Sequence, residues 1–251
     1  MGKLDQKVAI VTGAGGGIGR AIALELAKAG ASVAVCDINQ SDVEKVAGEI
    51  SALGRRSLAL RVDVSNAGQV RKMAEQTAKE FKKIDILVNN AGVVHRALIV
   101  DFAEADWDRV MSVNLKGIML CIQAVSPYML KQKYGKIVNL ASSAGIHIAS
   151  QLAAYGVSKA GVIHLTRIAA SELGPYGINV NSISPGTIDT DIYKRIRTPE
   201  QVAEFEENSK KNAFLGRLGK TQDIANLALF LVSDDSSFIT AENVVIDGGR
   251  A

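Results

Sequence analysis

Short apolar runs alternate with longer amphipathic stretches along the chain, and this alternation constrains the fold more than any other feature of the sequence. Seven apolar runs have the length and composition of buried strands: Val8–Val11, Ser32–Val35, Ser57–Leu60, Ile84–Val88, Lys136–Leu140, Ile178–Ile183 and Val244–Ile246. The stretches between them carry helical spacing: Gly19–Ala29, Asp42–Leu53, Asn66–Phe81, Asp106–Leu130, Ala154–Leu173 and Thr221–Leu231. Strict alternation implies right-handed crossovers and a parallel sheet with helices on both faces. No linker, repeat or low-complexity tract interrupts the pattern, so we predict one doubly wound α/β domain over residues 1–251.

One segment breaks the alternation. Between Pro185 and Gly219 the chain is long and polar and holds only a weak helical pattern, Glu200–Asn212. A polar excursion after a strand is often a lid over a functional site, and a plain surface insertion is the alternative. We predict a substrate lid over residues 187–219, with Gly186 and Gly219 as its hinges.

Charge and cysteine content exclude several classes of function. The net charge of +3 is small and the basic residues are scattered, so neither nucleic acid nor an anionic membrane is indicated as a partner. Cys36 and Cys121 lie far apart without metal-ligand spacing, which predicts reduced thiols and no metal site. We find no apolar run of membrane-spanning length, and a strand pattern begins almost at the N-terminus. We therefore expect a cytoplasmic protein that acts on a small molecule.

A glycine-rich turn, Thr12-Gly-Ala-Gly-Gly-Gly-Ile-Gly19, joins the first predicted strand to the first predicted helix. Small residues there let the backbone approach a pyrophosphate, and the helix N-terminus supplies amide donors. The spacing of Gly13, Gly17 and Gly19 departs from the usual dinucleotide fingerprint because Ile18 stands where its last glycine would be, so a purely structural turn is the alternative. Asp37 at the end of the second strand favours the nucleotide site. Its carboxylate can bind both ribose hydroxyls and would repel a 2′-phosphate, which predicts NAD as the cofactor.

Tyr155 and Lys159 are four residues apart on a predicted helix and therefore share a face. A cation beside a phenol favours the phenolate, which an acid/base tyrosine needs when it exchanges a proton with an alcohol or a carbonyl. Ser142 can donate a hydrogen bond to the same carbonyl oxygen. Asn114, inside an apolar helix, could anchor a water that carries the proton onward. Each has an ordinary structural alternative: a cap serine, a buried amide bonded to backbone, or a plain helix pair.

Taken together, these motifs resemble those of the short-chain dehydrogenase/reductase family, of the compact one-domain type with a Rossmann-like sheet. The resemblance covers essentially the full length, and several independent motifs occur in the expected order. They are Thr12–Gly19, Asp63-Val64, Asn89-Asn90-Ala91-Gly92, Asn114, Ser142, Tyr155 with Lys159, Pro185-Gly186 with Thr190, and Asp247-Gly248-Gly249.

The resemblance assigns roles to these residues. It implies that Asn114, Ser142, Tyr155 and Lys159 form the catalytic group, with Lys159 also holding the nicotinamide ribose. It also implies contacts with the remainder of the cofactor. They are Asp63 and Val64 at the adenine, Asn90, Ala91 and Gly92 along the adenosine-side ribose and strand floor, and Pro185, Gly186, Ile188 and Thr190 toward the nicotinamide carboxamide. A homotetramer is expected by the same resemblance.

The sequence says less about the substrate than about the cofactor. Ser142, Tyr155, His147 and Gln151 are the predicted substrate-contacting residues, within mostly apolar surroundings that include Val94, His95, Ile188 and Phe214. His147 is the candidate contact for a polar or acidic group, and a solvated loop histidine is the alternative.

Three functions remain open at this stage. The first is an NAD-dependent dehydrogenase for a secondary alcohol, diol, sugar alcohol or 3-hydroxyacyl compound. The second is an NAD(P)H-dependent 3-oxoacyl reductase of fatty-acid synthesis. The resemblance to those reductases is weaker at Gly15-Gly16 and at Tyr176, because basic residues are expected at these positions. The third is a non-catalytic nucleotide-binding sensor or assembly module on the same fold.

Overall fold

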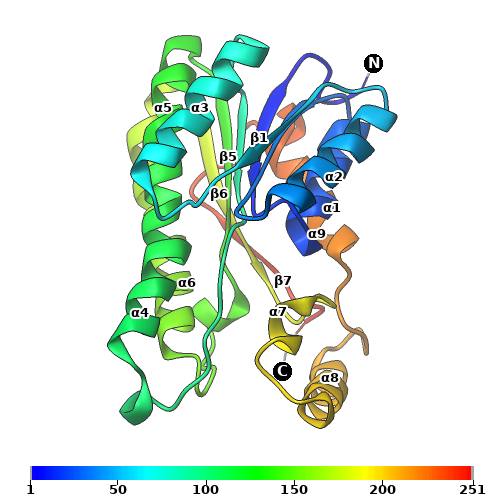
Figure 1. The fold of residues 1–251 in the computed structure, drawn as a ribbon, viewed down its shortest axis with the longest axis vertical. Helices are drawn as coiled ribbons and strands as arrows, with labels where there is room; N and C mark the ends of the chain where they lie inside the picture. The colour runs from blue at the N-terminus through cyan, green and yellow to red at the C-terminus, as the bar shows by residue number, and fades with distance from the viewer. Residues whose placement is uncertain (1, 250–251) are drawn as a thin grey trace.

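All seven predicted strands form one parallel sheet in the computed structural model, which describes residues 2–249 (Figure 1). The strands are β1 (Val8–Thr12), β2 (Ser32–Asp37), β3 (Ser57–Arg61), β4 (Ile86–Asn89), β5 (Gly135–Leu140), β6 (Ile178–Pro185) and β7 (Asn243–Ile246). Their order across the sheet is β3-β2-β1-β4-β5-β6-β7, and every neighbouring pair is parallel. The chain therefore winds outward in both directions from β1 and β4. The prediction of a doubly wound α/β sheet is confirmed.

Helices cover both faces of the sheet, as Figure 1 shows. One face carries α1 (Gly17–Lys28), α2 (Gln40–Ala52) and α9 (Thr221–Val232). The other carries α3 (Ala67–Phe81), α5 (Gly117–Gln132) and α6 (Ala153–Leu173). At the switch between β1 and β4 successive crossovers go to opposite faces, which opens a crevice at the carboxyl ends of the strands.

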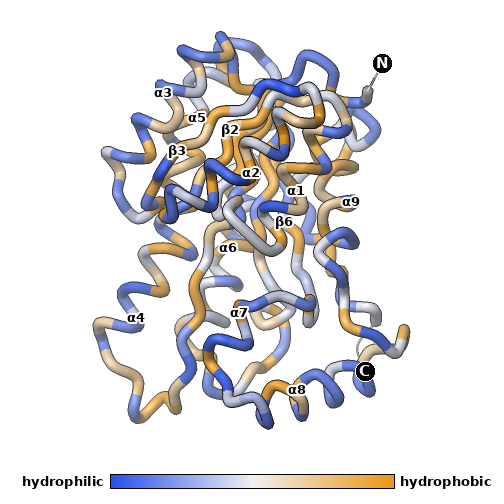
Figure 2. The backbone as a smooth tube through the Cα atoms, turned by 45° about the vertical axis from the view of Figure 1, so that its right-hand side comes forward, coloured by the Kyte–Doolittle hydropathy of each residue, from blue (hydrophilic) through white to orange (hydrophobic). Residues whose placement is uncertain are grey.

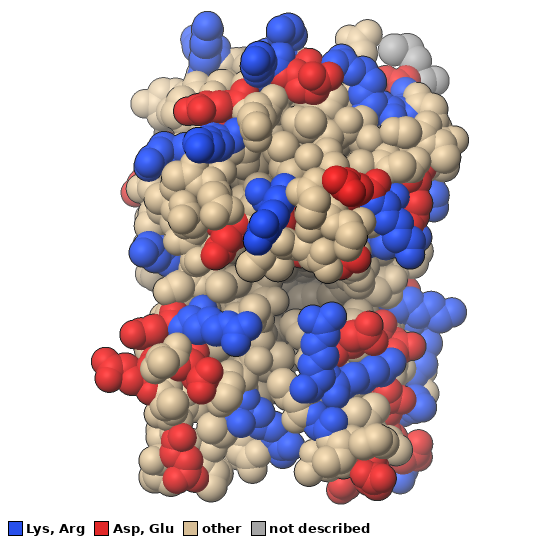
Figure 3. All heavy atoms as spheres, in the orientation of Figure 1, with Lys and Arg blue, Asp and Glu red and all other residues tan. Residues whose placement is uncertain are grey.

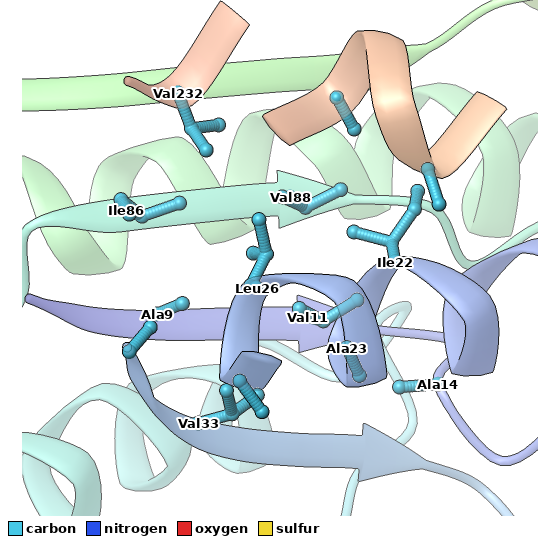
Figure 4. Close-up of a cluster of buried hydrophobic side chains, with 14 of the residues drawn as sticks. Ala9, Val11, Ala14, Ile22, Ala23, Leu26, Val33, Ile86, Val88 and Val232 are labelled. Atoms are coloured by element: carbon cyan, nitrogen blue, oxygen red, sulfur yellow. The ribbon is translucent and has the colours of Figure 1, made fainter. Parts of the chain in front are cut away.

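The face that carries α1, α2 and α9 is packed with small and branched side chains, which let the helices approach the sheet closely. Figure 4 shows Ile22, Ala23 and Leu26 of α1 lying over Val11 of β1 and Val88 of β4. All five side chains are fully buried. This packing fixes the N-terminus of α1 directly above the end of β1.

The long helix predicted over residues 106–130 is interrupted. It consists of α4 (Glu104–Met111), a π-helical turn η2 (Ser112–Lys116) and α5. Within the wide turn the Gly117 amide donates to the Ser112 carbonyl, and Asn114 is completely buried. The sequence pattern missed this turn because its cause is a tertiary contact of Asn114, described below.

The same helical run corrects a second prediction. Residues 104–132 are long and apolar enough, by length and composition, to cross a membrane, whereas we had expected no such run. Ile118, Cys121 and Val125 of this run are buried against the sheet. A core helix of a soluble protein passes the same test, so this run carries little weight as a membrane span.

The predicted lid contains two helices, α7 (Asp191–Lys194) and α8 (Pro199–Asn212), of which only the second was predicted. α8 begins with a capping box at Thr198 and has no buried residue. Figure 2 shows hydrophilic stretches along both helices, in contrast to the hydrophobic sheet. At the base of the segment the Asp189 amide donates to the Gly219 carbonyl (2.9 Å), and the Gly219 amide donates to the Thr187 carbonyl (2.9 Å).

Candidate active site

The glycine-rich turn packs so tightly that two of its positions exclude any side chain. Gly13 has a φ of 62°, and a Cβ there would lie 2.7 Å from the Cα of Ala91. A Cβ on Gly19 would lie 2.2 Å from the Gly13 carbonyl oxygen. The Asn90 side chain closes the arrangement by donating to the carbonyls of Thr12 (3.1 Å) and Gly13 (2.9 Å). The turn is thus bound to the end of β4, with the first amides of α1 next to it.

Asp37 lies beside this turn at the end of β2. Its carboxylate accepts from the Gly15 amide (3.1 Å) and the Asn39 amide (3.3 Å). Both contacts are made by backbone, which leaves acceptor positions on the two oxygens. A negative charge therefore stands within hydrogen-bond distance of the glycine turn.

Asp63 and Val64 follow β3 at the same edge of the sheet. The Asp63 carboxylate accepts from the amide (2.9 Å) and the hydroxyl (2.7 Å) of Ser65, which fixes its orientation. Val64 is buried, and a Cβ built on Gly117 would meet its side chain at 2.9 Å. These residues shape the β2 and β3 end of the crevice.

Tyr155, Lys159 and Ser142 line one cavity of about 510 Å³ at the carboxyl ends of the strands. Lys159 is only 3% exposed, and its Nζ donates to the Leu140 carbonyl at 2.5 Å. The same Nζ lies 5.7 Å from the centroid of the Tyr155 ring. Gly92 is adjacent, because a Cβ there would lie 3.7 Å from that Nζ. The predicted catalytic tyrosine, lysine and serine are therefore brought together.

Burial governs the acid/base properties of the pair. It lowers the pKa of Lys159 from 10.5 to about 8. It also raises the pKa of Tyr155 above 10, which a hydrogen bond with Ser142 partly offsets. Burial is thus the main influence on the Tyr155 pKa in this structure, and a lowering by Lys159 stays a prediction from the sequence. Burial disfavours the charged phenolate because the phenolate loses its solvation.

Asn114 is a buried amide that makes hydrogen bonds to two other segments of the chain. Its Oδ1 accepts from the Val93 amide (2.8 Å), and its Nδ2 donates to the Val93 carbonyl (2.9 Å) and to Ser158 Oγ (3.2 Å). It thereby ties the loop after β4 to η2 and α6. Its side chain acts here as a clamp on that loop, and the anchoring of a proton-relay water stays a prediction.

Comparison with known proteins gives matches over nearly the whole chain. Residues 13–251 match the family model described as enoyl-(acyl carrier protein) reductase. A (2S)-[(R)-hydroxy(phenyl)methyl]succinyl-CoA dehydrogenase subunit of Thauera aromatica is 42% identical, covering 99% of this chain and 98% of that protein. A 3-oxoacyl-[acyl-carrier-protein] reductase of Thermotoga maritima is 39% identical over 98% of each chain. An NAD-dependent glycerol dehydrogenase of Listeria innocua is 42% identical, covering 98% of this chain and 94% of that protein.

Comparison with solved structures gives matches of the same kind. A solved 7α-hydroxysteroid dehydrogenase, in complex with NADH and 7-oxo glycochenodeoxycholic acid, superposes with a TM-score of 0.94 at 39% identity, covering 99% of this chain and 95% of that one. This chain belongs to the short-chain dehydrogenase/reductase family. It is accordingly an oxidoreductase of the class that acts on alcohols and ketones with a nicotinamide cofactor.

The crevice of this dehydrogenase fits a nicotinamide dinucleotide on two observations. The turn leaves open space at Gly16, where a Cβ would meet nothing within 4 Å, and the Asp37 carboxylate stands beside the turn. The predicted cofactor and substrate residues then fall into two groups along the crevice. The cavity itself is lined by Ile18, Asn90, Gly92, Ser142, His147, Tyr155, Lys159, Pro185, Gly186, Ile188 and Thr190. Outside it are Gly13, Gly17, Gly19, Asp37, Asp63, Val64, Ala91, Asn114 and Gln151.

Gln151, a predicted substrate contact, lies outside the cavity lining. It has a φ of 66° and turns the chain, and its carbonyl accepts from the Ala97 amide at 3.0 Å. Its neighbours Ser150 and Leu152 line the cavity and Gln151 does not. His95 and Phe214, named with the apolar surroundings, are also absent from the lining, whereas Val94 belongs to it.

Sequence reasoning missed the lid residues that close the cavity. Tyr193, Arg197 and Phe205 all line it from α7, α8 and the turn between them. The segment was predicted to be a lid from its polarity, but no spacing pattern distinguished these three residues from their neighbours. Their inward position depends on contacts between the two lid helices.

Proposed function

We propose that this dehydrogenase transfers hydride between NAD(H) and a secondary alcohol or its ketone, and that Tyr155 moves the proton. The observation that carries the proposal is the convergence of Tyr155, Ser142 and Lys159 in one cavity, next to a crevice bordered by Asp37. The NAD dependence of the Listeria innocua relative supports the choice of cofactor.

Each side chain has a role set by its chemistry. The cofactor, when bound, supplies hydride transfer. Ser142 donates a hydrogen bond to the substrate oxygen, and Tyr155 takes the alcohol proton in oxidation or returns it in reduction. Lys159, held by the Leu140 carbonyl, would supply the positive charge that a phenolate requires and would also hold the nicotinamide ribose. Asp37, at the end of β2, accepts from the adenosine ribose hydroxyls.

The experiment is a panel of secondary alcohols, diols, sugar alcohols, 3-hydroxyacyl compounds and their ketones, assayed with NAD(H) and with NADP(H) through the nicotinamide absorbance. Turnover of at least one alcohol with NAD⁺ supports the proposal. Tight NADH binding without turnover of any compound would favour the non-catalytic sensor instead.

A 3-oxoacyl reductase is the second candidate, because the Thermotoga maritima relative carries that name at 39% identity. Gly15-Gly16 and Tyr176 count against it, because such reductases are expected to have basic residues at these positions. Efficient reduction of a 3-oxoacyl thioester with NADPH, and poor oxidation of simple alcohols, would favour this candidate.

We expect the dehydrogenase to be a homotetramer. Met119 and Leu120 of α5 are only half-buried, and Val157 of α6 is 50% exposed, so both helices keep apolar surface that a partner could cover. Gly161 does not belong to this surface, because it packs against Leu115 of the same chain.

Light scattering at micromolar protein should therefore give the mass of a tetramer. Val157→Glu should lower that mass, because a charge in an apolar interface costs several kcal/mol. Leu53→Glu, at an exposed apolar position at the end of α2, is the matched control and should leave the mass unchanged. A monomeric unmutated protein would contradict the expectation.

We also propose that residues 187–219 act as a mobile lid. α8 buries no side chain, so little packing holds it in the absence of ligand. Limited trypsin digestion should cut first at exposed sites in this segment, such as Arg195 and Lys211, and NADH should slow that cleavage. Cleavage at the exposed Lys133, outside the lid, is the internal control. Equal rates of lid cleavage with and without NADH would indicate a rigid insertion.

A further inference from the structure

The charged residues that line the cavity are nearly all paired within the protein. Arg217 makes two hydrogen bonds to the Asp223 carboxylate, at 2.7 and 3.2 Å. Lys159 donates to the Leu140 carbonyl, and the Asp247 carboxylate accepts from the Gly249 amide. Like Lys159, Arg197 forms no ion pair with any residue from 2 to 249, but its guanidinium carries more N–H donors than its one hydrogen bond uses.

The guanidinium of Arg197 is nevertheless held in place. Its Nη1 donates to the Tyr193 carbonyl at 3.1 Å, and its Cζ lies 4.0 Å from the centroid of the Phe205 ring. Stacking on an aromatic ring fixes the plane of a guanidinium and leaves its edge free to donate. The edge of Arg197 therefore keeps several N–H donors that no side chain among residues 2–249 uses.

A second cation stands near it. Arg96 belongs to the loop after β4, whose Ala97 pairs with the cavity-lining Leu152. Burial lowers the pKa of Arg197, and the positive charge of Arg96 lowers it further. Figure 3 shows Lys and Arg side chains on both sides of the hollow that crosses this face. A half-buried guanidinium without a carboxylate partner is stabilised by an anion that binds to it.

We propose that Arg197 binds an oxyanion carried by the substrate, so that the enzyme acts on hydroxy acids or phosphorylated alcohols in preference to neutral alcohols. A guanidinium edge matches the two oxygens of a carboxylate or phosphate. The anion contacts Arg197 in the lid while the carbinol carbon lies at Tyr155 and Ser142. Binding of the charged group would thereby draw α7 and α8 over the cavity.

This inference rests on the proposed function, and its test does not require turnover. Calorimetry on the enzyme–NADH complex measures the affinity of 3-hydroxy acids of increasing chain length, their methyl esters and the matching hydroxyalkyl phosphates. None of these reacts with reduced cofactor. We expect at least one acid or phosphate to bind more tightly than its neutral ester.

Arg197→Gln should then weaken binding of that anion by about 10- to 100-fold, while binding of the ester changes little. Arg195→Gln is the matched control, because Arg195 is exposed in the same connection between α7 and α8 and does not line the cavity. It should leave both affinities unchanged. The acid and the phosphate, compared in the unmutated enzyme, tell which oxyanion is preferred.

Three results would overturn the inference. They are equal or undetectable binding of every anion and its ester, an equal loss of affinity for both in Arg197→Gln, and a large loss of NADH affinity in that variant. The last would assign Arg197 to the cofactor's pyrophosphate. Turnover of neutral alcohols by the same preparation would leave the proposed dehydrogenase function intact in all three cases.

Discussion

Tyr155→Phe should lower kcat/KM for alcohol oxidation by about 10²–10⁴-fold, the range expected for loss of a general acid/base. The substitution removes only the phenolic oxygen, and the ring keeps its packing on α6. NADH affinity should change little, because the glycine turn and Asp37 lie outside the cavity that holds the phenol. The measurement is steady-state kinetics on the best alcohol of the panel, together with an NADH binding titration on the same protein.

Tyr176→Phe is the control for this change. Tyr176 is 51% exposed in a short helical turn before β6, so loss of its hydroxyl should leave activity unchanged. A Tyr155→Phe enzyme that oxidises the alcohol at a near-normal rate would remove Tyr155 from the mechanism. Lys159→Met should differ in kind, lowering both turnover and NADH affinity, because it removes a buried charge proposed to contact the ribose.

The pH dependence of catalysis follows from Tyr155 and Lys159. Burial raises the pKa of Tyr155, so the phenolate that accepts a proton forms only at high pH. Oxidation should therefore increase with pH, and reduction, which needs the protonated phenol, should fall. Lys159 loses its charge near pH 8 in the protein alone, so NADH affinity should decline above that pH if the ammonium contacts the ribose. A pH-independent NADH affinity would argue against that contact.

The sheet was predictable because its determinants are local. Runs such as Val8–Thr12 and Ile178–Pro185 are apolar, short and bounded by turns, and parallel strands buried on both faces have this composition. The meeting of Ser142 with Tyr155 and Lys159 was predictable for a related reason. Ser142 closely follows β5, so the fold brings it to the carboxyl edge of the sheet once the strand order is set.

The parts that escaped prediction depend on contacts between distant segments. The π-helical turn exists because Asn114 reaches the backbone of Val93 in another loop, and helical periodicity carries no sign of that contact. Arg197 lines the cavity because it stacks on Phe205 of a second helix. The pKa of Tyr155 could not be obtained from its spacing to Lys159, because the extent of burial is a property of the folded cavity.

Asp37→Ser should narrow or reverse the preference for NAD(H) over NADP(H). In the unmutated enzyme the Asp37 carboxylate lies 3.1 Å from the Gly15 amide, at the turn where the adenosine ribose is expected. A 2′-phosphate there would bring two negative charges together, and like charges at short range cost several kcal/mol, or about 10²-fold or more in relative affinity. Serine removes the repulsion but keeps a hydrogen-bonding group, so NADPH should gain more than NADH loses.

The ratio of kcat/KM for the two cofactors, measured on one alcohol, tests this expectation. Glu44→Gln is the control, because it removes a negative charge from the exposed face of α2, where Glu44 accepts only from Gln40. It should leave the ratio unchanged. Equal efficiency of both cofactors in the unmutated enzyme would show that Asp37 does not select between them. A ratio that stays the same in Asp37→Ser would mean that the adenosine ribose lies away from the end of β2, and the role of Asp37 would then be limited to its bonds to the Gly15 and Asn39 amides.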